Sequence, residues 1–195
     1  MELFVKLIFA AIIFVYSYRF IITLIKMKQE IVFPASFEEF NTIRKHPEKP
    51  VYPPTYSKQK TGIMIYALTL IYLTAMLIAS YFLDFFWSIY LLLILPIFHL
   101  SNLFNMFVFV QDGVLCGARF VPWRKIKSFE FVRIDVNHRY YGFSKEVNDQ
   151  YELKIKTRFA ILSCVVTSNE MKERLRYLLE EQRINELSLG KDIIY

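Results

Sequence analysis

The sequence has few cysteines, glycines and histidines, and each shortage argues against a class of protein. The chain contains 2 cysteines, 5 glycines and 3 histidines. Cys116 and Cys164 form no C-x-x-C pair, so the usual signature of a zinc site is missing. We interpret both cysteines as small, buried apolar residues rather than as a disulfide or a redox pair.

Catalytic motifs are also missing. The histidines stand at no recognisable spacing from a nucleophile, and no glycine elbow surrounds Ser163. The pair Gly113 and Gly117 is not followed by Gly-Lys-Ser or Gly-Lys-Thr, so it is not a phosphate-binding loop. The zinc-protease and EF-hand motifs do not occur. We therefore expect a protein that is not an enzyme, with no catalytic residue, no cofactor and no bound metal.

The charge is basic, yet no recognition motif for nucleic acid accompanies it. The formal net charge is +6, and 22% of the residues are charged. The hydrophobic fraction of 55% is high for a soluble protein. An uneven distribution, with apolar blocks in lipid and charged blocks in water, accounts for both values. We expect membrane lipids with anionic headgroups as partners, and no nucleic acid.

Three long apolar runs predict three transmembrane helices, because about 20 apolar residues cross a bilayer. The runs cover residues 3–25, 62–82 and 87–104. Lys6 and Arg19 lie near the ends of the first run, where long side chains reach the interface. A cleaved signal peptide is the alternative for this run, although no small-x-small cleavage site follows it. Pro96 interrupts the third run, which membrane helices tolerate.

The distribution of lysine and arginine predicts the orientation. The connection of residues 26–61 is rich in both, whereas the tip between the second and third runs carries only the charge of Asp84. Cytoplasmic loops are enriched in lysine and arginine. We therefore expect a multi-pass protein of the cell membrane, with its N-terminus outside and everything after residue 105 in the cytoplasm.

The connection itself has two parts. Residues 36–46 begin with Ser-x-x-Glu, a capping-box pattern, and predict a short helix on the membrane surface. The proline-rich stretch after His46 predicts a stiff, extended tether to the second span. These features divide the chain into a membrane domain at 1–105, a cytoplasmic domain at 106–184 and a frayed tail at 185–195.

The cytoplasmic domain has the pattern of several antiparallel strands followed by one helix. A tight turn at Gln111-Asp112-Gly113 joins the first two strands, and Gly117 indicates a bulge or bend in the second. After Pro122 and a short turn come further strands, with a polar loop at 142–150. The predicted strands cover residues 104–110, 114–121, 127–141, 151–158 and 159–166, and the amphipathic helix covers 168–184.

This order of elements resembles the PH-like domains on small bacterial membrane proteins of unassigned role. The resemblance covers residues 104–184. It is carried by Asp112, Gly113, the segment Phe120 to Ile126 and the helix at 169–183. It implies a PH-like antiparallel sheet or barrel with a C-terminal helix, on a protein of the bacterial inner membrane. Together with the three apolar runs, the expected fold is three transmembrane helices followed by this domain. The chain lacks a phosphoinositide pocket pattern, so no headgroup specificity is implied.

One basic cluster is the best candidate for a docking surface. It consists of Arg124, Lys125, Lys127, Lys154, Lys156 and Arg158. We expect docking to anionic headgroups, to a partner membrane protein or to a second copy of the chain; the simpler interpretation is a solvated face beside an anionic bilayer. Two other functions stay open: an immunity or stress-protection protein against membrane-active peptides, and an accessory subunit of a membrane transport complex.

Overall fold

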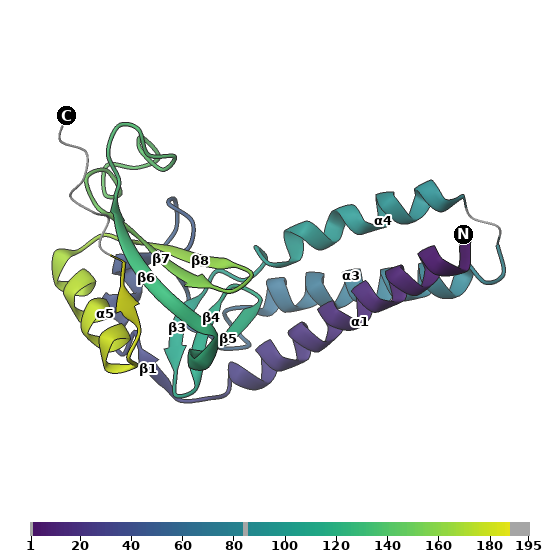
Figure 1. Ribbon diagram of the computed structural model, residues 1–195, viewed down its shortest axis with the longest axis horizontal. Helices are drawn as coiled ribbons and strands as arrows, with labels where there is room; N and C mark the ends of the chain where they lie inside the picture. The colour runs from purple at the N-terminus through teal and green to yellow at the C-terminus, as the bar shows by residue number, and fades with distance from the viewer. Residues whose placement is uncertain (1, 84–85, 188–195) are drawn as a thin grey trace. The chain divides into compact units, whose positions relative to one another are not determined.

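The chain divides into a helical unit and a sheet unit. The computed structural model describes residues 2–83 and 86–187 (Figure 1). The helical unit consists of Met1–Gln29, Pro54–Phe104 and Gly117–Phe120. The sheet unit consists of Glu30–Pro53, Asn105–Cys116 and Val121–Tyr195. Each unit is thus assembled from separate segments of the chain.

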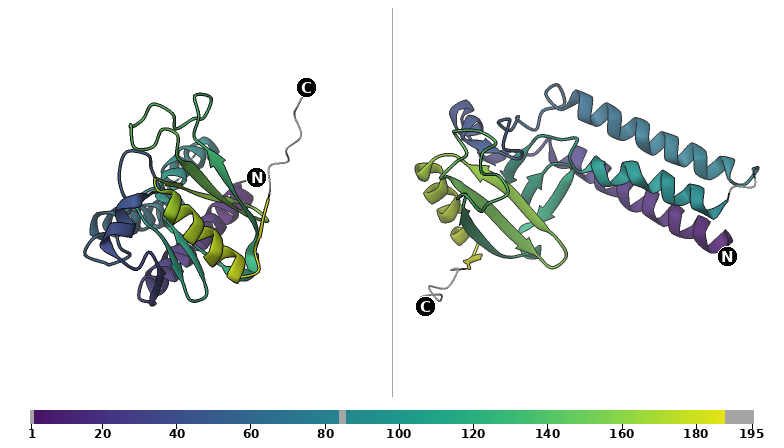
Figure 2. Two further views of the ribbon diagram at one scale, coloured as in Figure 1. Left: turned by 90° about the vertical axis from the view of Figure 1, so that its left-hand side faces the viewer. Right: turned by 90° about the horizontal axis from the view of Figure 1, so that it is seen from above.

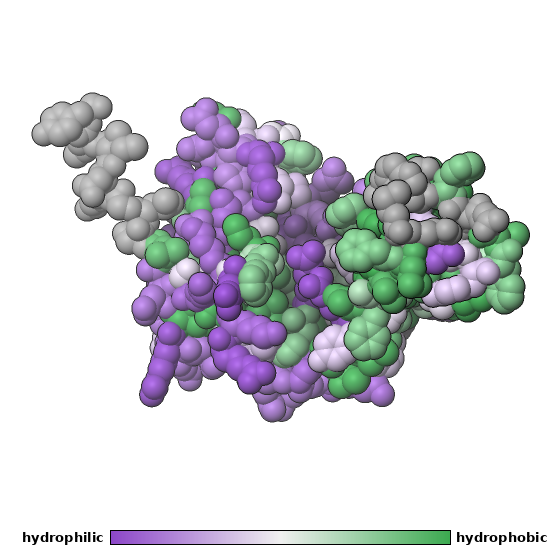
Figure 3. Space-filling model, turned by 45° about the vertical axis from the view of Figure 1, so that its right-hand side comes forward, coloured by the Kyte–Doolittle hydropathy of each residue, from purple (hydrophilic) through white to green (hydrophobic). Residues whose placement is uncertain are grey.

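Three helices form the helical unit: α1 (Glu2–Lys26), α3 (Lys60–Ala79) and α4 (Trp87–Leu100). They contact one another and run side by side (Figures 1 and 2). Hydrophobic residues gather over their surface, and hydrophilic residues over that of the sheet unit (Figure 3). Two helical segments, Leu3–Lys26 and Lys60–Ala79, are long and apolar enough to cross a membrane. The expected third span contains a helix of only 14 residues, so a third crossing remains a prediction.

Aromatic pairs hold the three helices together. Phe20 stacks on Tyr66 with ring centroids 4.5 Å apart, and Phe9 meets Tyr90 edge-on at 5.5 Å. Lys6 donates a hydrogen bond of 2.8 Å to the carbonyl oxygen of Ser80, which follows the last residue of α3. A cation there complements the partial negative charge of a helix C-terminus. The N-terminal part of α1 therefore lies beside the C-terminal end of α3.

Gly62 allows α3 to approach the segment that follows α4. A Cβ atom at Gly62 would lie 2.6 Å from the carbonyl oxygen of Leu103. The same segment binds residues after Gly117: the amide of Ala118 donates to the Ser101 carbonyl at 3.4 Å, and Arg119 Nε donates to Ser101 Oγ at 3.2 Å. The helix ends near residues 62 and 101 are thus tightly joined.

The first sheet has the strand order β1-β3-β4-β5. Its strands are β1 (Ile31–Phe33), β3 (Phe107–Val110), β4 (Gly113–Cys116) and β5 (Arg119–Pro122). β3 and β4 form the hairpin predicted around Gln-Asp-Gly, with Val110 opposite Gly113. The expected second strand at 114–121 is wrong, because a turn at Gly117 divides it into β4 and β5. Gly117 has φ +57°, a conformation that glycine adopts without strain.

The second sheet has the order β2-β8-β7-β6-β9. Its strands are β2 (Ile43–Arg44), β6 (Ile126–Arg133), β7 (Tyr151–Thr157), β8 (Ile161–Val166) and β9 (Asn185–Glu186). The short 3-10 helix η1 (Trp123–Lys125) leads into β6. Helix α5 (Asn169–Glu181) contacts β8 and β9 (Figure 1). Leu153, Ile155 and Leu175 are fully buried and form part of the core, so the predicted apolar positions of β7 at Leu153 and Ile155 and the apolar stripe of the helix are confirmed.

The connection of residues 26–61 is not the surface helix and tether that its composition predicts. It does contain the short helix α2 (Phe37–Thr42), whose Ser36 cap accepts a hydrogen bond of 3.3 Å from the amide of Glu39. Yet β1 pairs with β3 and β2 pairs with β8 on either side of that helix. The segment Glu30–Pro53 is therefore built into the sheet unit.

Two other boundaries differ from expectation. The long strand expected at 127–141 ends at Arg133, and a loop of turns covers 134–150. The tail expected to fray begins with β9, which pairs in parallel with β6. Residues 188–195 of that tail, and Asp84 at the expected hairpin tip, lie outside the described residues.

Candidate functional site: a basic tip and a buried carboxylate

The six basic residues of the predicted docking surface lie on β6, β7 and their flanks, but they do not share one environment. Lys154 and Lys156 stand within β7 on the face that carries two carboxylates. Lys156 Nζ lies 2.9 Å from Glu130 Oε2, and Lys154 Nζ lies 3.5 Å from Glu152 Oε2. Both carboxylates are buried, so they largely offset the charge of the two lysines. The role of these two lysines in docking stays a prediction, and less of their charge is available to an external anion.

The other four basic residues gather at one end of the β6–β7 ladder. Ile126 pairs with Thr157, which brings η1 and the start of β6 to the turn between β7 and β8. All four are exposed, and none forms an ion pair with any residue in the ranges 2–83 and 86–187. They are Arg124, Lys125, Lys127 and Arg158. Their charge is available to an external anion.

The turn between β7 and β8 presents apolar side chains beside this charge. Phe159 is 88% exposed and Ile161 is 59% exposed. The guanidinium of Arg158 lies 5.0 Å from the centroid of the Phe159 ring. Thr157 fixes the turn, since its amide donates to the carbonyl of Ala160 at 2.9 Å and its Oγ1 accepts from the Ala160 amide at 3.0 Å. These hydrogen bonds fix the backbone of the turn that presents the Phe159 ring to solvent.

We call this surface the basic tip. It is defined by Arg124, Lys125, Lys127, Arg158, Phe159 and Ile161. Basic residues next to exposed apolar ones match the interface of an anionic bilayer, where the charges meet headgroups and the rings enter the acyl boundary. The exposure of Phe159 and Ile161 was not predicted, because the apolar run of residues 159–166 has the composition of one continuous strand. That composition gives no sign of the turn at its beginning.

A second cluster, also not predicted, surrounds the buried side chain of Glu152. Its two oxygens bind groups from the loop at 134–150: Arg139 Nη2 donates to Oε1 at 2.6 Å, and His138 Nε2 lies 2.9 Å from Oε2. Glu152 is wholly buried, whereas the alternating pattern of β7 places it among the exposed polar residues. The loop that covers it follows no regular period, so the pattern gives no sign of this burial.

The hydrogen bonds of His138 indicate which tautomer its ring adopts. The backbone amide of Tyr140 donates to His138 Nδ1 at 3.2 Å, so that nitrogen carries no proton. Nε2 then carries the proton and donates it to Glu152. Both ring nitrogens are engaged within the protein. The geometry is that of a clamp that attaches the loop to β7 rather than of a catalytic dyad.

Burial shapes the titration of the groups around this clamp. Burial raises the pKa of the Tyr140 phenol, and it raises the pKa of the Cys164 thiol well above its usual value, with smaller contributions from Cys116 and Glu152. Partial burial lowers the pKa of Arg139, but the hydrogen bond and charge of Glu152 outweigh it, so the net shift is upward. Arg139 therefore stays charged and the thiol stays neutral at physiological pH.

Both cysteines are buried, as their interpretation as small apolar residues requires. Among the residues that the structure describes, no group of three histidine, cysteine or acidic side chains is placed to hold a metal ion. Comparisons of the chain with protein-family models, with curated proteins and with solved structures return no match.

Proposed function

We propose that the chain is a multi-pass membrane protein whose sheet unit docks on the anionic surface of a bilayer through the basic tip. The protein performs no catalysis in this proposal. The observation that carries it is the position of four exposed basic residues beside the exposed ring of Phe159 on one fixed turn. Each basic residue near an anionic surface contributes about 1 kcal/mol to binding.

The pairing of β1 with β3 supports three crossings. Ile31 lies before α3 and pairs with Val110, which lies after α4. The two strands must be on the same side of the membrane. If α3 crosses the bilayer, the chain has to return between residues 80 and 105, and α4 lies there. Although α4 alone is short, this topological requirement favours a third crossing.

The basic residues favour an orientation with the sheet unit in the cytoplasm. Lysine and arginine are common in the connection between α1 and α3. At the opposite end of these helices, Lys6 is engaged by the carbonyl of Ser80. Because cytoplasmic loops are enriched in basic residues, this distribution favours an N-terminus outside the cell.

The architecture of the sheet unit is in keeping with a PH-like domain. Two sheets, antiparallel except for the pair β6–β9, and the helix α5 near the C-terminus support that family resemblance. The resemblance extends to residues 31–44 in this proposal, because β1 and β2 complete the sheets. A bacterial inner membrane is the location that the resemblance favours.

The proposal is tested on the full chain in proteoliposomes. Phe159→Cys is labelled with an environment-sensitive fluorophore; Cys116 and Cys164 are buried and do not compete. In phosphatidylcholine vesicles that contain phosphatidylglycerol, the emission should shift to the blue and iodide quenching should fall. High salt should reverse the shift, because it screens the charges.

The matched control removes the same amount of charge elsewhere. Glutamine at Arg124, Lys125, Lys127 and Arg158 should abolish the shift. Glutamine at the exposed residues Lys49, Arg133, Lys145 and Arg183 should leave it intact. An equal shift in pure phosphatidylcholine, or an equal loss in both variants, contradicts the proposal. A shift that requires a second protein instead of anionic lipid assigns the tip to a partner.

A further inference from the structure

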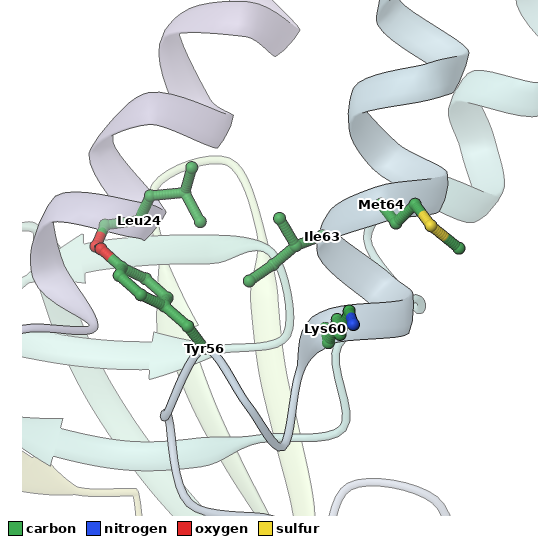
Figure 4. Close-up of a pocket in the computed structure, with 5 residues that line it drawn as sticks. All are labelled: Leu24, Tyr56, Lys60, Ile63 and Met64. Carbon is green, nitrogen blue, oxygen red and sulfur yellow. The ribbon is translucent and has the colours of Figure 1, made fainter.

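The helical unit contains an open, apolar groove. The groove has a volume of about 480 Å³ and lies between the end of α1 and the start of α3 (Figure 4). It is lined by Leu24, Tyr56, Lys60, Ile63 and Met64. This volume is within the range of roughly 300–1,000 Å³ that is usual for small-molecule sites.

A hydrogen bond keeps one wall of the groove in place. Tyr56 precedes α3 in the chain, and its hydroxyl donates to the carbonyl oxygen of Leu24 in the last turns of α1 at 2.8 Å. Figure 4 shows Tyr56 and Leu24 on one side of the gap and Ile63 on the other. The Tyr56 ring is therefore held at the end of α1, and the gap between this ring and Ile63 stays open.

The rim of the groove is basic. Lys60 is the first residue of α3 and lines the groove itself. Lys28 Nζ lies 5.8 Å from the centroid of the Tyr56 ring. An apolar floor with cations at one edge is complementary to a molecule that has a hydrocarbon chain and an anionic head.

We propose that this groove binds an anionic phospholipid, with one acyl chain along Leu24, Ile63 and Met64 and its phosphate at Lys60 and Lys28. Both helices that form it are long and apolar enough to lie in a membrane. Basic pockets between transmembrane helices are a recognised site for anionic headgroups. The inference rests on the membrane location of the helices, and it does not depend on docking by the basic tip.

The test measures lipid retention by the intact chain. The full-length protein is purified in mild detergent and supplied with phosphatidylglycerol or with phosphatidylcholine of the same chain length. Native mass spectrometry then counts the bound lipids. We expect one phosphatidylglycerol to be retained, and retention to fall about fivefold in Lys60→Gln. The control Lys58→Gln removes an equal charge two positions away, outside the groove, and should retain the lipid.

A second pair of variants tests the apolar floor. Ile63→Trp fills the groove and should abolish retention, whereas Ile71→Trp, at an exposed position further along α3, should not. Circular dichroism confirms that each variant is folded. Equal retention of phosphatidylcholine, unchanged retention in Ile63→Trp, or an equal loss in Lys60→Gln and Lys58→Gln overturns the inference.

The two proposals fail separately. Substitution of the four basic residues of the tip should not change lipid retention, and substitution of Lys60 should not change the fluorescence of a label at residue 159. Free fatty acid retained as well as phosphatidylglycerol would overturn the role assigned to the phosphate.

Discussion

His138 donates a hydrogen bond of 2.9 Å to Glu152, and the second oxygen of the same carboxylate accepts one of 2.6 Å from Arg139. The donors come from a loop without regular structure, while the acceptor belongs to β7. The carboxylate therefore links residues 134–150 to the centre of the second sheet. A buried charge with partners on both oxygens stabilises the fold only while those partners remain.

Removal of this carboxylate should destabilise the sheet unit. Glu152→Ala leaves the buried His138 and the more exposed Arg139 without their acceptor, and we expect the free energy of unfolding to fall by about 1–3 kcal/mol. Glu152→Gln should cost less, because its amide oxygen still accepts one bond. The protein is unfolded with urea in detergent micelles, and the unfolded fraction is measured by alkylation of Cys116 and Cys164, which are buried in the folded chain. Glu180→Ala, at an exposed carboxylate, is the control, and an equal effect there would refute the clamp.

The raised pKa of the Cys164 thiol predicts that the folded protein loses stability at alkaline pH. Its pKa is raised in the folded chain, chiefly by burial, so the unfolded chain releases the proton first. The stability it contributes is complete below the ordinary thiol pKa of about 9 and declines as the pH rises beyond it, by up to roughly 1.4 kcal/mol per pH unit. Tyr140, whose pKa is also raised, adds the same trend at higher pH.

The measurement is the free energy of unfolding between pH 8 and pH 10.5. Cys164→Ala should flatten the alkaline decline, whatever it does to stability at neutral pH. Maleimide should leave Cys164 unmodified in the folded protein at pH 8. Rapid modification of the native chain would show that the thiol is not buried.

Gly62→Ala should destabilise the helical unit. Alanine within a helix ordinarily stabilises it by about 0.5–1 kcal/mol relative to glycine. Here the new methyl group would lie 2.6 Å from the backbone oxygen of Leu103, and overpacking of this kind costs about 1–3 kcal/mol. We therefore expect a lower Tm in detergent by calorimetry. Thr61→Ala, at the neighbouring exposed position, is the control; a higher Tm for Gly62→Ala would contradict the close approach.

The number of crossings can be measured with a membrane-impermeant maleimide on intact cells. Phe82→Cys lies just after α3, and Lys145→Cys lies in the loop of the sheet unit. We expect Phe82→Cys to be labelled without lysis and Lys145→Cys only after permeabilisation, because α4 returns the chain to the cytoplasm. Labelling of both positions from the same side would contradict the third crossing.

Local patterns in the sequence predict the elements whose partners are near in the chain. Length and apolarity indicate the two long helices, alternation identifies β7, and the spacing of Met171 and Leu175 identifies α5. Ser36 and Glu39 mark the beginning of α2, and the structure forms that cap. In each case the stabilising contact follows the period of the element itself.

Contacts between distant segments leave no comparable pattern. The short strands β1 and β2 acquire their conformation from β3 and β8, so the connection between the spans shows no strand period of its own. Likewise Glu152 looks like an exposed residue until the loop at 134–150 covers it. Of the six basic residues expected to act together, only four remain exposed without an ion pair in the described chain, because Glu130 and Glu152 bind the other two.

The sheet unit is interrupted in the chain by α3 and α4, and this determines the order in which it can assemble. During synthesis β1 leaves the ribosome before α3, but its partner β3 is translated only after α4. The partner of β2 is β8, which is translated later still, near the end of the chain. The nascent chain must therefore form α3 and α4 while two strand edges are still unpaired. A chaperone that shields residues 30–53 during translation would act at the step where this protein is most prone to aggregate.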